Sequence, residues 1–174
     1  MKELFVVMCT LYFLSGCVSN PDYPDSWAEI SSDRYCQEIN GKFRNAGINQ
    51  DGHEVRLYSY LFGEISTEVD YIEMLTSNNE ITVSAYSKGK LVKEHIEDIA
   101  ERSCNNGLLE IDISASEDGI DREGVVGYVL ERNRFSISES NDLIIHRSST
   151  GAVLVFIIPV VGSIWSWAKF SEIN

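Results

Sequence analysis

Past residue 40, apolar and polar side chains alternate at every second position, in short segments that are separated by turn residues. This period is typical of half-buried β-strands. Two such segments flank Lys88-Gly89, which predicts a hairpin with a tight glycine turn. We expect about eight short antiparallel strands, forming a small barrel or a strongly curved sheet, with a lipocalin-like shape among the candidates. The clearest expected strands are 40–47, 80–87, 90–97, 108–116, 125–132, 134–140 and 142–149.

Two segments depart from this period and favour one or two short helices. In 53–64, Val55, Tyr58 and Leu61 follow helical spacing, so we predict a short helix there. Leu91, His95 and Ile99 could also line one face of a helix. We nevertheless predict a strand for this second segment, because it directly follows the predicted turn.

The stretch 151–170 is apolar and has no charged residue from Gly151 to Ala168. Its length alone permits a membrane-spanning helix. Its many β-branched residues, with Pro159 and Gly162 near the centre, instead favour two strands. We expect a buried hairpin that turns at 159–163 and places Trp165 and Trp167 on one face, and keep as alternatives a hairpin or helix dipping into lipid and a true membrane span.

The amino terminus has the layout of a signal peptide, with Lys2 ahead of an apolar run at 4–14 and small residues behind it. The run is too short to span a bilayer as a permanent helix, which needs roughly 20 residues. The residues that follow, Leu14-Ser15-Gly16-Cys17, resemble the lipobox of bacterial lipoproteins. The resemblance implies cleavage before Cys17 and acylation of its sulfur, with palmitate among the chains added.

This resemblance divides the chain into a signal peptide at 1–16, a lipidated cysteine with a flexible tether at 17–26, and a single domain at 27–174. Val18 stands where lipoproteins retained in the inner membrane usually have Asp. The resemblance therefore implies an outer-membrane lipoprotein whose domain faces the periplasm, with exposure on the cell surface left open. The protein would then be bound to the membrane through the lipid on Cys17.

Cys36 and Cys104 are the cysteines left in the mature chain after Cys9 and Cys17 are accounted for. In an oxidising compartment an isolated pair is most simply a disulfide. Two free thiols and a metal site are the alternatives. No CxxC, HxxxH or HExxH spacing supports the metal.

The formal net charge of −13 argues against a nucleic-acid partner, because phosphate binding needs a basic surface. The charge has two interpretations: a solvated surface, or a surface that attracts a basic partner.

Candidate chemistry is sparse. His53, His95 and His146 lie in no catalytic motif, and the acidic loop 116–124 lacks the spacing of an EF-hand. We therefore expect ordinary surface residues at these positions, no cofactor or metal, and no enzyme activity.

A fainter resemblance, confined to the two ends of the domain, links the chain to uncharacterised proteobacterial lipoproteins. It rests on Trp27, Cys36, Gly41, Lys42, Phe43, Asn45, Gly47 and 167–170. That group carries no established activity. We expect a non-enzymatic envelope module that binds a protein or a small apolar ligand or supports envelope assembly. The alternatives are an inhibitor of a basic, lysozyme-like enzyme and, with less support, a hydrolase.

Overall fold

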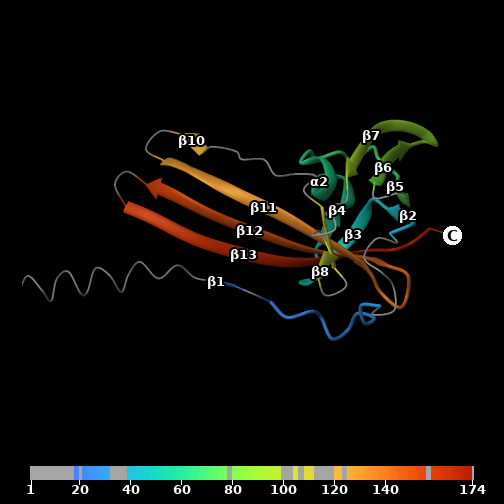
Figure 1. Ribbon diagram of the computed structural model, residues 1–174, viewed down its shortest axis with the longest axis horizontal. Coiled ribbons are helices and arrows are strands. Elements are labelled where there is room, and N and C mark those ends of the chain that lie inside the picture. The colour runs from blue at the N-terminus through green and yellow to red at the C-terminus, as the bar shows by residue number, and fades with distance from the viewer. Residues whose placement is uncertain are drawn as a thin grey trace, which may run out of the picture.

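In the residues that the computed structural model describes, the protein is built from two packed β-sheets and one short helix (Figure 1). The structure describes residues 18–19, 21–31, 39–77, 80–98, 104–105, 108–111, 120–122, 125–155 and 158–173. Within these residues the fold is mainly β, and the strands do not close into a barrel. The expected fold class is confirmed in its curved-sheet form.

The large sheet has nine strands, and its centre is a set of three 13-residue strands. These are β11 (Val125–Ile137), β12 (Leu143–Val155) and β13 (Ile158–Phe170). Beyond β13 lie β3 (Ala46–Asn49) and β4 (Glu54–Arg56), and beyond β11 lie β9 (Leu108–Ile111) and β8 (Cys104–Asn105). Two further strands lie off this path: β10 (Ile120–Arg122) pairs with β11, and β1 (Val18–Ser19) pairs with β13. The β1–β13 pairing is parallel, and the other strand pairs are antiparallel.

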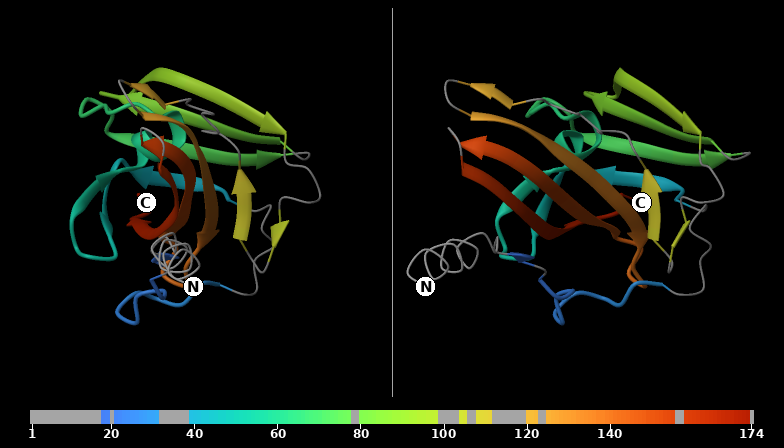
Figure 2. Two further views of the ribbon diagram at one scale, coloured as in Figure 1. Left: turned by 90° about the vertical axis from the view of Figure 1, so that its left-hand side faces the viewer. Right: turned by 60° about the vertical axis from the view of Figure 1, so that its left-hand side comes forward.

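The small sheet has four strands in the order β2-β5-β6-β7 and packs across one end of the large sheet (Figure 2). Its strands are β2 (Gly41–Arg44), β5 (Tyr71–Ser77), β6 (Glu80–Ser87) and β7 (Lys90–Asp98). The predicted hairpin between β6 and β7 is confirmed. Lys88 and Gly89 both have positive φ angles, 51° and 72°, as a tight two-residue turn between twisted strands requires.

The long strands differ from the shorter strands that the sequence predicts, because two expected breaks are absent. β11 runs straight through Asn133, and β12 runs through Gly151. Asn133 stays in the strand because its amide nitrogen donates to the Tyr60 carbonyl, 2.8 Å away, inside the core. Gly151 lies close to β11, where an added Cβ would stand 3.2 Å from the Tyr128 carbonyl oxygen.

The segment 40–47, predicted to be one strand, is two strands that belong to different sheets. Asn45 stands between β2 and β3 and is buried. Its amide nitrogen donates to the Val69 carbonyl at 2.9 Å, and its amide oxygen accepts from the Tyr58 backbone N–H at 2.9 Å. These bonds hold the chain where it passes from the small sheet to the large one.

The helix predicted at 53–64 is confirmed in a shorter form, α2 (Leu57–Phe62). The first part of the expected helix pairs instead as β4 with β3. α2 ends at Gly63, whose φ of 69° allows the left-handed conformation that commonly closes a helix. Leu57 and Leu61 are fully buried and join the main core between the two sheets.

The large sheet has a core face and an outer face. The core face carries Phe135, Ile145 and Ala168, which pack with residues of the small sheet and α2. The outer face carries Ile144 and Trp167, which pack with Trp27 in a second, smaller cluster. The segment that precedes the domain also reaches this face, where the Trp167 indole N–H donates to the Pro21 carbonyl at 3.0 Å.

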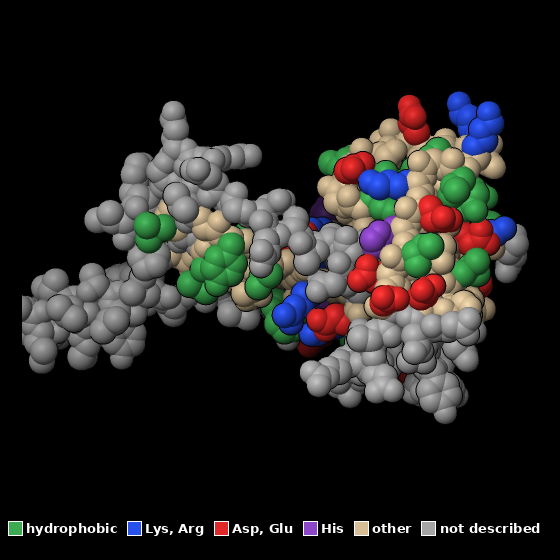
Figure 3. All heavy atoms as spheres, turned by 45° about the horizontal axis from the view of Figure 1, so that its top comes forward, with side chains coloured by type: hydrophobic (Ala, Val, Ile, Leu, Met, Phe, Trp, Pro, Cys, Tyr) green, Lys and Arg blue, Asp and Glu red, His purple; other side chains and the backbone are tan. Residues whose placement is uncertain are grey.

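The apolar stretch 151–170 forms an antiparallel strand pair, as expected, but two details of the expectation are wrong. β12 ends at Val155 and β13 begins at Ile158, so residues 159–163 are paired strand and not a turn. The pair is also not buried at its far end, where Leu154, Val160 and Val161 are 43%, 46% and 56% exposed. Figure 3 shows hydrophobic side chains on this projecting part, whereas the visible charged side chains gather on the body.

Within the described residues, no helix is long and apolar enough to cross a membrane. The predicted Cys36–Cys104 disulfide and the lipidation site Cys17 fall outside what the structure describes, apart from the backbone of Cys104 in β8.

Candidate functional site

The candidate site lies on the outer face of the large sheet, where β11, β12 and β13 run side by side. Antiparallel register brings alternate residues of the three strands into rows. Three successive rows combine cationic, hydroxyl and aromatic side chains. The rows are Leu130–Thr150–Ser163, Arg132–Ser148–Trp165 and Arg134–His146–Trp167.

These rows enclose a groove of about 330 Å³. Its volume is at the lower end of the range for small-molecule sites, about 300–1,000 Å³. One apolar residue, one indole, two hydroxyls and two guanidinium groups line it, which gives it both flat apolar surface and hydrogen-bond donors. The lining residues are Leu130, Arg132, Arg134, Ser148, Thr150 and Trp165.

The two arginines share one carboxylate. Nε of Arg134 donates to Glu110 on β9 at 3.1 Å, and Nε of Arg132 lies 3.7 Å from the other oxygen of Glu110. The Arg134 side chain is 28% exposed and the Arg132 side chain 55%. Two positive charges against one negative charge leave this patch cationic, on a chain whose net charge is −13.

His146 lies in the third row and is buried, with 6% of its surface exposed. Its ring stacks on Trp167, with the ring centroids 4.0 Å apart and the planes 16° from parallel. Burial lowers the pKa of His146, and the positive charge of Arg134 lowers this pKa further. The imidazole is therefore neutral at pH 7, and the cationic character of the patch comes from the arginines alone.

Three buried polar atoms on this face have no hydrogen-bond partner within the described protein: Nε1 of Trp165, Nε2 of His146 and Oγ of Ser136. A buried polar group without a partner costs about 1–3 kcal/mol. Such groups are uncommon in native structures and call for a partner from outside the chain, such as water or a ligand. Trp165 is the one that lines the groove.

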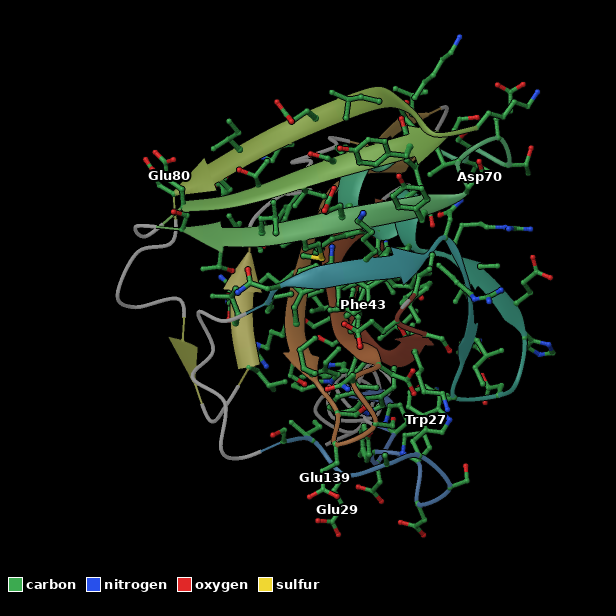
Figure 4. The ribbon with its side chains drawn as sticks, turned by 90° about the vertical axis from the view of Figure 1, so that its right-hand side faces the viewer. Trp27, Glu29, Phe43, Asp70, Glu80 and Glu139 are labelled. Carbon is green, nitrogen blue, oxygen red and sulfur yellow. The ribbon has the colours of Figure 1, made fainter. Side chains whose placement is uncertain are left out.

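An aromatic cluster closes the body end of the site. Tyr23 packs edge-on against both Trp27 and Trp167, with centroid distances of 5.9 and 5.2 Å. The ammonium group of Lys169 lies 5.3 Å from the Trp27 ring centroid. Figure 4 shows Trp27 on the far side of the long strands from Phe43 of the small sheet. This cluster holds Trp167, and through it the stacked His146, in a fixed orientation.

The sequence-predicted histidines are not brought together. His53 is exposed in the loop between β3 and β4, and Nε2 of His95 on β7 lies 3.0 Å from a carboxylate oxygen of Glu97. The expectation that each histidine is ordinary surface is wrong for His146, because two tryptophans on β13 cover it. In the described residues, no group of three or more His, Cys, Asp or Glu side chains is placed to hold a metal ion.

Sequence reasoning missed Arg132, Arg134, Ser148 and Thr150 as site residues. The available signal was an arginine at each of two alternate positions in a strand whose two ends are mainly apolar. Their meeting with Trp165 depends on the register of β12 with both neighbours, which no local pattern gives.

The arrangement can hold an anion at the guanidinium groups while a flat ring lies against Leu130 and Trp165. The lining side chains offer guanidinium and hydroxyl hydrogen-bond donors beside apolar surface, which suits them to binding. Comparison of the chain with protein-family models, curated proteins and solved structures finds no match.

Proposed function

We propose that this chain is a lipid-anchored envelope module that binds a small anionic ligand in the groove on the outer face of its large sheet. The observation that carries the proposal is the pairing of Arg132 and Arg134 beside the buried indole N–H of Trp165, which has no hydrogen-bond partner among the described residues. The groove attracts an anion locally, whereas the rest of a chain with a net charge of −13 repels it.

The groove's chemistry defines the ligand class. Guanidinium groups bind carboxylate and phosphate with two parallel hydrogen bonds, so one end of the ligand is acidic. Leu130 and Trp165 offer apolar surface to a ring, and Ser148 and Thr150 offer hydroxyls to its polar substituents. The expected ligand is a ring-sized compound that carries one carboxylate or phosphate. A sugar acid has all of these parts.

Binding can be tested by calorimetry with two sugars that differ in one group. N-acetylmuramic acid carries a carboxylate on a lactyl ether attached to its ring, and N-acetylglucosamine is the same ring without that ether. We expect saturable binding of the acid and at least about tenfold weaker binding of the neutral sugar, since a hydrogen bond to a charged group contributes about 1.5–3 kcal/mol. A sugar phosphate serves as the second acidic probe.

Two matched variants separate the groove from general electrostatics. Arg132→Gln removes one positive charge from the groove, and Arg44→Gln removes one from an exposed position on β2 of the small sheet. We expect R132Q to weaken acid binding by about tenfold or more and R44Q to change it less than twofold. If neither acid binds at millimolar concentration, or if both variants weaken binding equally, the groove is not the ligand site.

The anchor part of the proposal is supported by the lipobox-like residues Leu14-Ser15-Gly16-Cys17. With two or three acyl chains on Cys17, the protein would remain on the membrane, whereas one chain binds only marginally. We place it at the outer membrane with its body in the periplasm. Cys17→Ser should abolish labelling by radioactive palmitate, and Cys9→Ser, a cysteine inside the expected signal peptide, should leave labelling intact. Labelling of C17S would contradict the anchor.

A further inference from the structure

The far ends of the three long strands form a second feature, which adjoins the groove and shares Leu130 and Thr150 with it. We define the projecting end as residues 125–130, 150–155 and 158–164. It extends away from the body on the side opposite the small sheet, as Figure 1 shows. The sequence of all three segments contains no charged residue. The described side chains there include Tyr128, Val161 and Ile164, which are 54%, 56% and 68% exposed.

Apolar side chains are exposed on both faces of this end. Val160 lies on the core face and Val161 on the outer face, and each has about half of its surface exposed. A protein partner or a second copy laid on one face would leave the other face in water. A lipid surface surrounds both faces at once, so it is the environment that matches this pattern.

The β1–β13 pairing places the expected anchor on the same side. β1 runs parallel to β13, with Val18 opposite Ser163. The amino-terminal end of β1 is therefore the end that lies nearer to the start of β13. From Ser163 to the start of β13 at Ile158 is five residues, or about 17 Å at ~3.3 Å per residue. Lipid on Cys17 would thus be attached next to Val18, about 17 Å along the strand from the start of β13.

We propose that the projecting end rests in the lipid surface to which Cys17 is anchored, with its tip in the interfacial layer. This inference rests on the proposed anchor and adds a second point of membrane contact. Two contacts fix the orientation of the body, whereas a lipid on one residue lets it rotate freely.

The edges of the sheet limit the depth of insertion. Within the described residues, β13 has no partner strand on its free side from Ile158 to Gly162. Open sheet edges do not occur in the hydrocarbon region, because their N–H and C=O groups would lose all partners. On the other edge, β10 places Asp121 and Arg122 beside the first residues of β11. The tip therefore reaches only the boundary of headgroups and acyl chains, about 5–10 Å deep.

The test uses fluorescence quenching by lipid brominated near the headgroup end of its acyl chains, because the tip is expected at the boundary of headgroups and acyl chains. Val161→Trp places an indole at the projecting end, and Ile96→Trp places one on β7 of the small sheet. The two positions are matched, as Val161 is 56% and Ile96 55% exposed. Mature protein purified with its native amino terminus is reconstituted in phosphatidylcholine vesicles with and without the brominated lipid. The parent protein supplies the background of its native tryptophans.

We expect bromine to reduce the added V161W emission at least about twofold and to leave the added I96W emission unchanged. Equal quenching of the two, or none at V161W while the protein remains on the vesicles, overturns the inference and leaves the anchor standing. V161W emission that shifts to the blue as protein concentration rises, without quenching, assigns this end to a second copy and also overturns it. Palmitate labelling of Cys17 in the same preparation shows separately whether the anchor proposal itself has failed.

Discussion

The two ends of the same three strands have opposite surroundings. At the body end, the small sheet and α2 cover the core face of β11–β13, and Tyr23 and Trp27 pack on the outer face. At the projecting end the strands keep their register, but apolar residues on both faces stay exposed. A continuous apolar run in a strand therefore predicts that both faces of the strand are buried. It does not show whether the same chain or another molecule buries them.

The largest expected difference between the two ends is in folding stability. Ile145 on β12 is fully buried in the main core, whereas Ile164 on β13 is 68% exposed. Ile145→Ala should destabilise the protein by about 2–5 kcal/mol, because it removes buried methylene groups and leaves a cavity. Ile164→Ala should change the free energy of unfolding by less than about 0.5 kcal/mol. Urea denaturation in the absence of lipid measures both, and similar losses would show that the projecting end is packed in solution.

Two glycines give a second, smaller contrast. An added Cβ at Gly47 on β3 would stand 2.4 Å from the Lys169 carbonyl oxygen and 2.4 Å from the Phe170 ring. Gly162 on β13 has nothing within 4 Å of that position. Gly47→Ala should therefore cost about 1–3 kcal/mol by forcing β3 away from β13.

Gly162→Ala is the matched control for this prediction, and should leave stability within about 0.5 kcal/mol of the parent. The thermal unfolding midpoint of each variant checks the pair. An unchanged midpoint for G47A would mean that β3 can shift on β13 without loss of stability. The close approach of the two strands would then contribute nothing to the free energy of unfolding.

The sequence predicts which strands and helix form better than it predicts where each strand ends and which sheet it joins. The β6–β7 turn was predictable because Lys88-Gly89 carries its own local signal, a glycine where φ must be positive. The mainly β class followed from the alternation. The effect of Asn45 and Asn133 on their strands was harder to predict, because an asparagine in a strand-like segment can end the strand or stay inside it. The outcome depends on carbonyls from Val69 and Tyr60, which are distant in sequence.

The site was less predictable than the fold for the same physical reason. Arg132, Ser148 and Trp165 form one row of the groove, yet they lie on three strands and meet only through two registers. His146 is a second residue whose surroundings the sequence does not reveal. Its neighbours in sequence, Ile145 and Arg147, do not distinguish a surface histidine from one stacked on a tryptophan of the next strand.

The smallest expected effect is the pH dependence that His146 contributes at the body end. Burial and Arg134 lower the pKa of His146 in the folded protein, whereas the unfolded chain has an ordinary histidine pKa near 6.5. Above that pH both states are neutral and no penalty exists. As pH falls below about 6.5, His146 becomes protonated in the unfolded state while it stays neutral in the folded state. The free energy of unfolding therefore decreases by at most about 1.4 kcal/mol per pH unit.

His146→Phe keeps a flat ring against Trp167 and removes the titrating group, so it isolates this contribution. Between pH 7.5 and 5.5 the parent should lose more unfolding free energy in urea than H146F loses. Below the folded-state pKa, where both states of the parent are protonated, the difference should stop growing and stay constant. If the two proteins lose the same amount, His146 is hydrated or paired in solution. The aromatic cluster of Tyr23, Trp27 and Trp167 would then leave the outer face of the body end open to water, as both faces are at the projecting end.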